Sequence, residues 1–141
     1  MNKSLKDTLK ISECLNAIAI SATGSATGVD TAFGESLMFL VNAGEFDFSG
    51  SNSLDLVVQH ADVDTDGSYA DCVDADIFDA EDGANGIAKV LDSTDDKNAI
   101  HIIHYRGTKR YVRVRYEETG TVSVPLSIVA VQGHLKANPA S

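Results

Sequence analysis

Apolar and polar residues alternate along most of this chain, which is the pattern of strands that bury one face. The segments 53–60 (SLDLVVQH) and 109–116 (KRYVRVRY) show it most clearly, with valines and leucines on one side and polar residues on the other. The pattern predicts strands at 14–20, 36–42, 53–60, 69–73, 86–91, 99–105, 109–116 and 122–132. Because no stretch has the period of an amphipathic helix, we predict an all-β fold of about eight short antiparallel strands, in a sandwich, jelly roll or barrel.

Turn residues separate these strands and indicate how the chain is organised. A loop rich in Gly, Ser and Thr follows residue 20, and the Asp-Gly pair in Asp62–Ser68 (DVDTDGS) predicts a hairpin tip. Arg106-Gly107-Thr108 predicts a tight turn between two strands. With no linker or repeat, residues 1–141 are expected to form one domain, with an extended N-terminal arm at 1–13 and a C-terminal tail at 133–141.

Charge is unevenly distributed along the 141 residues, which carry 11 Lys and Arg against 21 Asp and Glu. Fifteen of the acids lie between Glu45 and Asp96, whereas residues 97–115 hold six basic residues and no acid. The net charge of -10 argues against nucleic acid as a partner. No apolar run approaches the ~20 residues of a membrane span, so no membrane partner is expected either. Such asymmetry favours complementary surfaces, within the fold or between copies.

Four segments carry a resemblance to a known group of proteins. They are GVDTAFGESLMFLVNAG, VVQHADVDTDGSYADC, YRGTKRYVRVRYEETG and VPLSIVAVQGHLKANP, and together the likeness spans roughly residues 15–136. In these segments the chain resembles the capsid decoration, or cement, proteins of tailed bacteriophages. It departs from them in its longer acidic DVDTDG hairpin and in its FDAEDGANG loop.

The resemblance implies a jelly-roll sandwich whose function is binding and not catalysis. It implies a virion structural protein, without cofactor, that is assembled in the bacterial host cytoplasm and stabilises the outer capsid surface by bridging subunits. The implied partners are the major capsid protein and a second copy of the chain, with a homodimer preferred over a trimer. Two alternatives stay open: a soluble sandwich that binds carbohydrate or calcium, and a tail or neck component of the virion.

The sequence offers one weak candidate for a metal site. Asp62, Asp64 and Asp66, followed by Gly67, match the opening of a calcium loop. The twelfth position of such a loop, where a bidentate Glu is required, is Val73. We therefore prefer to interpret these acids as a solvated hairpin tip, and we expect no metal there.

Other residue types that could support chemistry do not form a catalytic or metal-binding pattern. His101 and His104 are three residues apart, so in a strand they point to opposite faces and cannot chelate together. Cys14 and Cys72 lack a CxxC motif and are interpreted as buried thiols. No nucleophile elbow occurs, and the chain has no Trp to form a sugar platform. We predict that the protein is not an enzyme.

Basic residues are the candidates for contacts between chains. Arg113 and Arg115 are expected to pair with an acidic loop of a neighbouring copy, such as residues 74–82. The full set of interface candidates is Lys3, Lys6, Lys10, Arg106, Arg110, Arg113 and Arg115.

Overall fold

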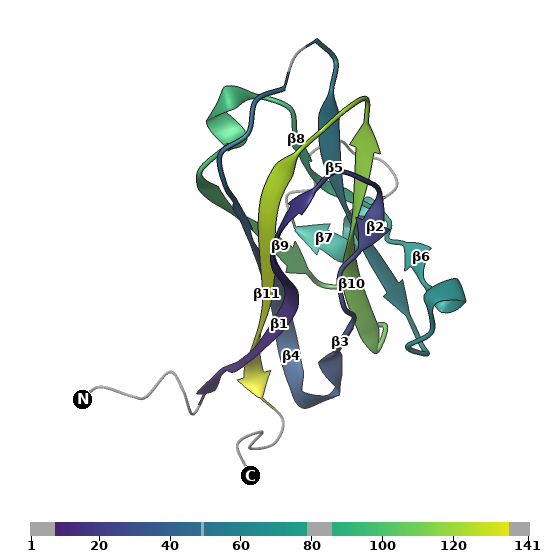
Figure 1. Ribbon diagram of the computed structural model, residues 1–141. Helices are drawn as coiled ribbons and strands as arrows, with labels where there is room; N and C mark the ends of the chain where they lie inside the picture. Colours follow the sequence, from purple (N-terminus) through teal and green to yellow (C-terminus); the bar gives the residue numbers. More distant parts are fainter. Residues whose placement is uncertain (1–7, 49, 79–85, 136–141) are drawn as a thin grey trace, which may run out of the picture.

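The structure is a computed structural model that describes residues 8–48, 50–78 and 86–135. Two antiparallel sheets pack face to face (Figure 1), and the all-β prediction is confirmed. The strands are β1 (Lys10–Ile20), β2 (Gly24–Ser25), β3 (Val29–Asp30), β4 (Gly34–Ala43), β5 (Ser53–Ala61), β6 (Ala70–Asp71), β7 (Ile77–Phe78), β8 (Ile87–Leu91), β9 (Ala99–Tyr105), β10 (Tyr111–Thr119) and β11 (Val124–Leu135). Short 3₁₀ turns are η1 (Thr31–Phe33), η2 (Asp66–Ser68), η3 (Asp74–Asp76) and η4 (Thr94–Asp96).

The order of strands is that of a jelly roll. The first sheet runs β1-β11-β4-β9-β7, and the second runs β2-β10-β5-β6, with β3 also on β10 and β8 also on β5. The antiparallel pairs are nested along the chain: β1 pairs with β11, β2 and β3 with β10, β4 with β9, and β5 with β8. A long hairpin rolled into two sheets gives this nesting, as in jelly-roll sandwiches.

Alternate residues of both sheets fill the space between them. In β4 these are Leu37, Phe39 and Val41, and β11 contributes Leu126 and Ile128 from the same sheet, all of them buried. The second sheet supplies Leu54, Leu56, Val58, Val112 and Val114, which were predicted to share the apolar sides of their strands. Period-two alternation therefore identified the core side of these strands correctly.

Both ends of the sandwich differ from the predicted boundaries. β1 begins at Lys10, so residues 10–13 of the predicted arm are hydrogen bonded to β11. β11 continues to Leu135, so residues 133–135 of the predicted tail belong to the sheet. Residues 1–7 and 136–141, which hold the rest of both segments, lie outside the described residues.

The predicted tight turn at Arg106–Thr108 is wrong. β9 belongs to the first sheet and β10 to the second, so residues 106–110 cross the end of the sandwich instead of joining neighbouring strands. Tyr105 holds this crossing, because its Oη accepts a hydrogen bond from the Lys109 backbone N–H at 3.1 Å. No helix among the described residues is long and apolar enough to cross a membrane.

Candidate functional site

The outer face of the first sheet is lined by apolar side chains. The register places Phe78, His104, Met38, Val131 and Ile11 side by side across the strands β7, β9, β4, β11 and β1. A second row runs Ile102, Leu40, Val129, and a third begins at Ile100. We call the apolar members of these rows the outer apolar face: Ile11, Met38, Leu40, Phe78, Ile100, Ile102, Val129 and Val131.

Four members of the outer apolar face are mostly in contact with solvent. Ile11 and Ile102 are each 66% exposed, Ile100 is 62% exposed and Phe78 is 53% exposed. The exposure of Ile100 and Ile102 follows from the sequence of β9, AIHIIHY, which places isoleucines on both faces of the strand. Ile103 therefore enters the core while Ile100 and Ile102 face outward. An exposed apolar patch of several hundred Å² commonly marks a protein-binding surface.

The size of this face fits a protein interface. Five strands at a spacing of ~4.8 Å are about 24 Å wide, and the seven residues of β9 at ~3.3 Å are about 23 Å long. The product, about 550 Å², is an upper bound, because the same rows also contain the polar residues His104, Asn42 and Glu13. A stable interface of ordinary size buries about 800 Å² per partner, so the outer apolar face can supply only part of such an interface.

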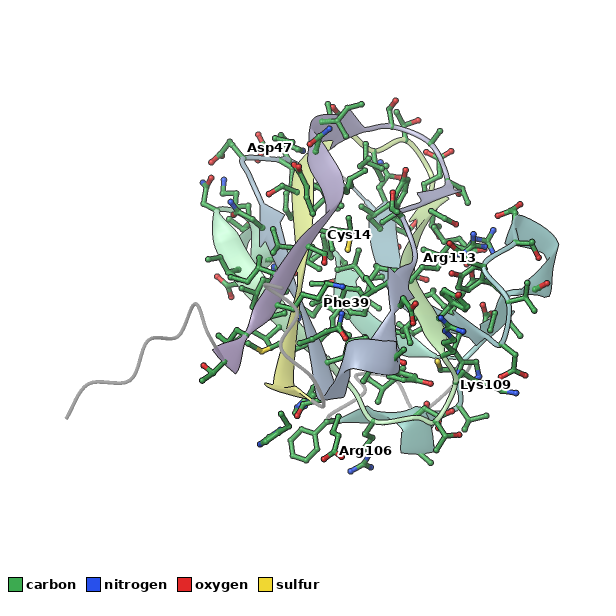
Figure 2. All side chains as sticks on the ribbon, turned by 90° about the horizontal axis from the view of Figure 1, so that it is seen from below. Cys14, Phe39, Asp47, Arg106, Lys109 and Arg113 are labelled. Atoms are coloured by element: carbon green, nitrogen blue, oxygen red, sulfur yellow. The ribbon has the colours of Figure 1, made fainter. Side chains whose placement is uncertain are left out.

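The outer surface of the second sheet is polar and is organised around Arg113. In Figure 2, Phe39 lies in the interior, and Arg113 and Lys109 lie toward the second sheet. Arg113 Nη1 lies 2.7 Å from Asp66 Oδ1, and its Nε donates to Gln59 Oε1 at 2.8 Å. The Tyr69 ring covers the guanidinium, with 4.1 Å between Arg113 Cζ and the ring centroid. Only 12% of the Arg113 side chain is exposed.

Two more basic residues of this region pair with acids of the same chain. Arg110 binds both carboxylate oxygens of Asp30, at 3.1 and 3.0 Å, and its guanidinium lies over the Tyr111 ring. The Arg110 hydrogen bond is the main cause that holds the pKa of Asp30 below its usual value. Lys109 Nζ lies 2.9 Å from Asp62 Oδ2. Arg110, a predicted interface residue, and Lys109, which was not among the candidates, thus both have partners within the chain.

Arg115 differs from its neighbours on β10. Among the residues that the structure describes, no carboxylate lies within ion-pair distance of its guanidinium. Arg115 lines a polar hollow over β10 and the segment 23–26, together with Gln59, Arg113 and the carboxylate residue Asp66, which pairs with Arg113. An acidic side chain of another protein could pair with Arg115 there.

The other interface candidates are placed as follows. Arg106 lies at the end of the sandwich, where its Nε donates to the Ala75 carbonyl and its guanidinium lies 5.5 Å from the centroid of the Phe78 ring. Lys10 begins β1 opposite Gln132 and is half-buried. Lys3 and Lys6 lie outside the described residues.

The three acids of the calcium-loop motif have separate partners. Asp62 pairs with Lys109, Asp66 pairs with Arg113, and Asp64 accepts a hydrogen bond from the Tyr69 hydroxyl at 2.7 Å. Burial, followed by this bond, raises the pKa of Tyr69. In the described part of the chain these three carboxylates do not converge on one point, which agrees with the interpretation of the segment as a hairpin tip.

Comparison with known proteins adds no assignment. No known protein family matches the chain, and no curated protein matches its sequence. The candidate site therefore rests on the surfaces themselves. Sequence reasoning named basic residues as the interface and did not single out the outer apolar face. The signal that could have found this face is the presence of apolar residues in both phases of 36–42 (SLMFLVN) and 99–105.

Proposed function

We propose that this chain is a non-enzymatic virion structural protein that binds the outer surface of a phage capsid and stabilises it by bridging major capsid subunits. The observation that supports this proposal is the outer apolar face, and in the proposal this face binds the shell. The major capsid protein is proposed as the partner because of the resemblance to decoration proteins. The orientation of the chain on the shell is proposed because the outer face of the first sheet is largely apolar, whereas that of the second sheet is polar.

The orientation follows from the cost of leaving each face in water. Covering an Ile side chain is worth roughly 1.5–3 kcal/mol, so the exposed two thirds of Ile100 and Ile102 represent about 1–2 kcal/mol each. The second sheet gains nothing comparable, because its Arg113 and Arg110 are already paired within the chain. The first sheet therefore meets the shell and the second faces solvent.

Self-association is assigned to a different surface. For the expected homodimer we propose the hollow at Arg115, which receives an acidic side chain of a second copy. With separate surfaces for the shell and for the second copy, one dimer can contact two shell subunits, and the two contacts add by avidity.

Cosedimentation with capsid shells that lack the protein tests the main proposal. The wild-type chain should bind saturably, and the double variant Ile100→Thr, Ile102→Thr should bind about 30-fold more weakly, which corresponds to a loss of about 2 kcal/mol. Threonine is β-branched like isoleucine and suits an exposed strand position, so the variant should fold.

The matched control is Val63→Thr. Val63 is 57% exposed but lies at the tip between β5 and β6, away from the first sheet. This control should bind like the wild type. Failure of the wild-type chain to bind shells would end the capsid proposal. Equal binding by the folded double variant would show that the outer apolar face is not the docking surface.

A further inference from the structure

Three side chains with metal-binding atoms meet at the end of the sandwich where η3 lies. They are His60 of β5, Cys72 just after β6, and Asp76 at the end of η3. One nitrogen, one sulfur and one oxygen from these residues all lie within 4.8 Å of one another. Within the residues that the structure describes, no other three His, Cys, Asp or Glu side chains converge in this way.

The backbone around each of the three residues is fixed by hydrogen bonds. The Cys72 N–H donates to the Val58 carbonyl at 2.9 Å, which ties the cysteine to β5. The Asp76 carbonyl accepts from the Arg106 N–H at 2.8 Å, and Arg106 Nε donates to the neighbouring Ala75 carbonyl. The three positions are therefore set by the fold and not by a mobile loop end.

The ring of His60 is oriented by Tyr105. His60 Nδ1 lies 3.0 Å from Tyr105 Oη, and the two rings meet edge to face with centroids 5.9 Å apart. A histidine that binds a metal through one ring nitrogen usually donates from the other to an oxygen, which fixes the tautomer and the ring plane. When His60 donates from Nδ1 to Tyr105, its lone pair is on Nε2, and Tyr105 would then support a metal bound at Nε2.

We propose that His60, Cys72 and Asp76 bind a divalent transition-metal ion of the zinc type. Imidazole nitrogen, thiolate sulfur and carboxylate oxygen are the three donors that zinc takes, at about 2.0–2.3 Å. Tetrahedral bonds of that length place the donor atoms about 3.3–3.6 Å apart. Because the donor atoms lie within 4.8 Å of one another, no distance between them has to shorten by more than about 1.5 Å.

The charges also balance at this site. Cys72 is 1% exposed. Metal binding forms a sulfur–metal bond while the proton of the Cys72 thiol leaves to solvent. The thiolate and the Asp76 carboxylate together neutralise the two positive charges of the ion.

The three residues differ in burial: His60 and Asp76 are partly exposed, whereas Cys72 is buried. Three protein ligands leave one tetrahedral position for a water molecule. The bound ion would clip β5, the segment after β6 and η3 together, and would stabilise this end of the sandwich without any role in capsid binding.

Cobalt titration of the purified protein tests the site, because a thiolate bound to Co²⁺ gives a charge-transfer absorption band in the near ultraviolet. The wild-type chain should bind one Co²⁺ with this band, Zn²⁺ should displace it, and Zn²⁺ should raise the melting temperature. Cys72→Ser should lose the band, whereas Cys14→Ser should keep it, because Cys14 is buried elsewhere with its Sγ near the Ser12 carbonyl.

A histidine variant keeps the test valid if Cys72→Ser does not fold. His60→Asn retains both thiols and should bind Co²⁺ at least about tenfold more weakly. The control is His101→Asn, which alters a histidine held by the Asp96 carbonyl and should bind like the wild type. Absence of the band in the wild type, its persistence in Cys72→Ser, or wild-type affinity in His60→Asn would each overturn the proposal.

Discussion

Arg113 and Arg115 lie two residues apart on the same side of β10, and we predict that they have opposite roles. Arg113 is covered and paired within the chain, whereas Arg115 borders an open hollow. Replacing Arg113 with Ala should destabilise the fold without changing oligomeric state directly. Replacing Arg115 with Ala should leave the fold intact and weaken self-association.

The magnitude for Arg113 follows from its three contacts. Its charged hydrogen bond to Gln59, a side chain only 6% exposed, is worth about 1.5–3 kcal/mol. The stacking on Tyr69 adds about 0.5–1 kcal/mol. The ion pair with Asp66 adds little, since 92% of the Asp66 side chain is exposed. Arg113→Ala should therefore cost about 2–4 kcal/mol, and Arg115→Ala at most about 0.5 kcal/mol.

Urea unfolding followed by circular dichroism measures both values, and the mass of the native species measures self-association. Arg113→Lys keeps the positive charge but loses the planar guanidinium with its several N–H donors and most of the stacking on Tyr69. Its free energy of unfolding should therefore lie between those of the wild type and Arg113→Ala. The reasoning about Arg113 would be refuted if its Ala variant were within 1 kcal/mol of the wild type. The role of Arg115 would be refuted if its Ala variant kept the wild-type oligomer mass.

Three further predictions concern the fold. Asp96→Ala should cost about 2 kcal/mol in urea unfolding, because Asp96 accepts backbone N–H bonds at the start of η4, while Asp95→Ala in the same turn should be nearly neutral. Burial raises the pKa of Asp96, but these hydrogen bonds and Lys89 outweigh it, and the pKa in the folded chain is lowered. The contribution of Asp96 to the free energy of unfolding should therefore be complete above its unfolded pKa of ~3.9. It should be lost as the pH falls through the lower pKa of the folded chain. Gly86→Ala should destabilise by more than about 1 kcal/mol, since φ is +77° and main-chain atoms lie 2.8–2.9 Å from the added Cβ, whereas Gly67→Ala meets open space and should be tolerated. Burial raises the pKa of both thiols, to about 11 and about 12, so neither should react with iodoacetamide at pH 8 until the chain unfolds.

Strand positions could be predicted from the sequence because β5 and β10 alternate between buried apolar and outward polar residues, and because β9, although isoleucines occupy both of its faces, is a short apolar run bounded by turn residues. The segment 99–105 was predicted with the bounds that the structure gives to β9, and 53–60 lacks only the last residue of β5. His101 and His104 lie on opposite faces as expected, the first half-buried and the second exposed. Alternation in the sequence detects a strand when successive side chains face the core and the outside in turn, as they do in these strands.

The two-residue strands β2, β3 and β7 were not predicted, because two residues contain no period, whereas the predicted strand at 69–73 contains the two-residue strand β6. β2 and β3 exist because the edge of β10 offers hydrogen bonds to whatever segment passes it. The predicted turn at Arg106–Thr108 failed for a related reason. A Gly between two strand patterns indicates a change of direction, but it does not distinguish a hairpin within one sheet from a crossing between two sheets.

The metal-ligand cluster shows a different limit of the sequence argument. Spacing rules test ligands that are close along the chain, and they excluded a site formed by His101 and His104. His60, Cys72 and Asp76 come from a strand, a connecting segment and a 3₁₀ turn, and they meet only because β6 folds back on β5. The Cys and Asp four residues apart are too common a pattern to indicate a metal without the histidine brought in by the sheet.

The distribution of charge acquires a structural meaning from the two sheets. The basic segment 97–115 and the acidic hairpin at 62–66 are far apart in sequence but meet on the second sheet, where Lys109 and Arg113 pair with Asp62 and Asp66. Most of the complementarity predicted between surfaces is thus satisfied inside one chain. On the outer apolar face of the first sheet, Arg106 covers only Phe78, whereas Ile100 and Ile102 remain 62% and 66% exposed. Burial of these isoleucines needs a partner outside the described chain, and this is the physical reason for placing the proposed docking surface on the first sheet.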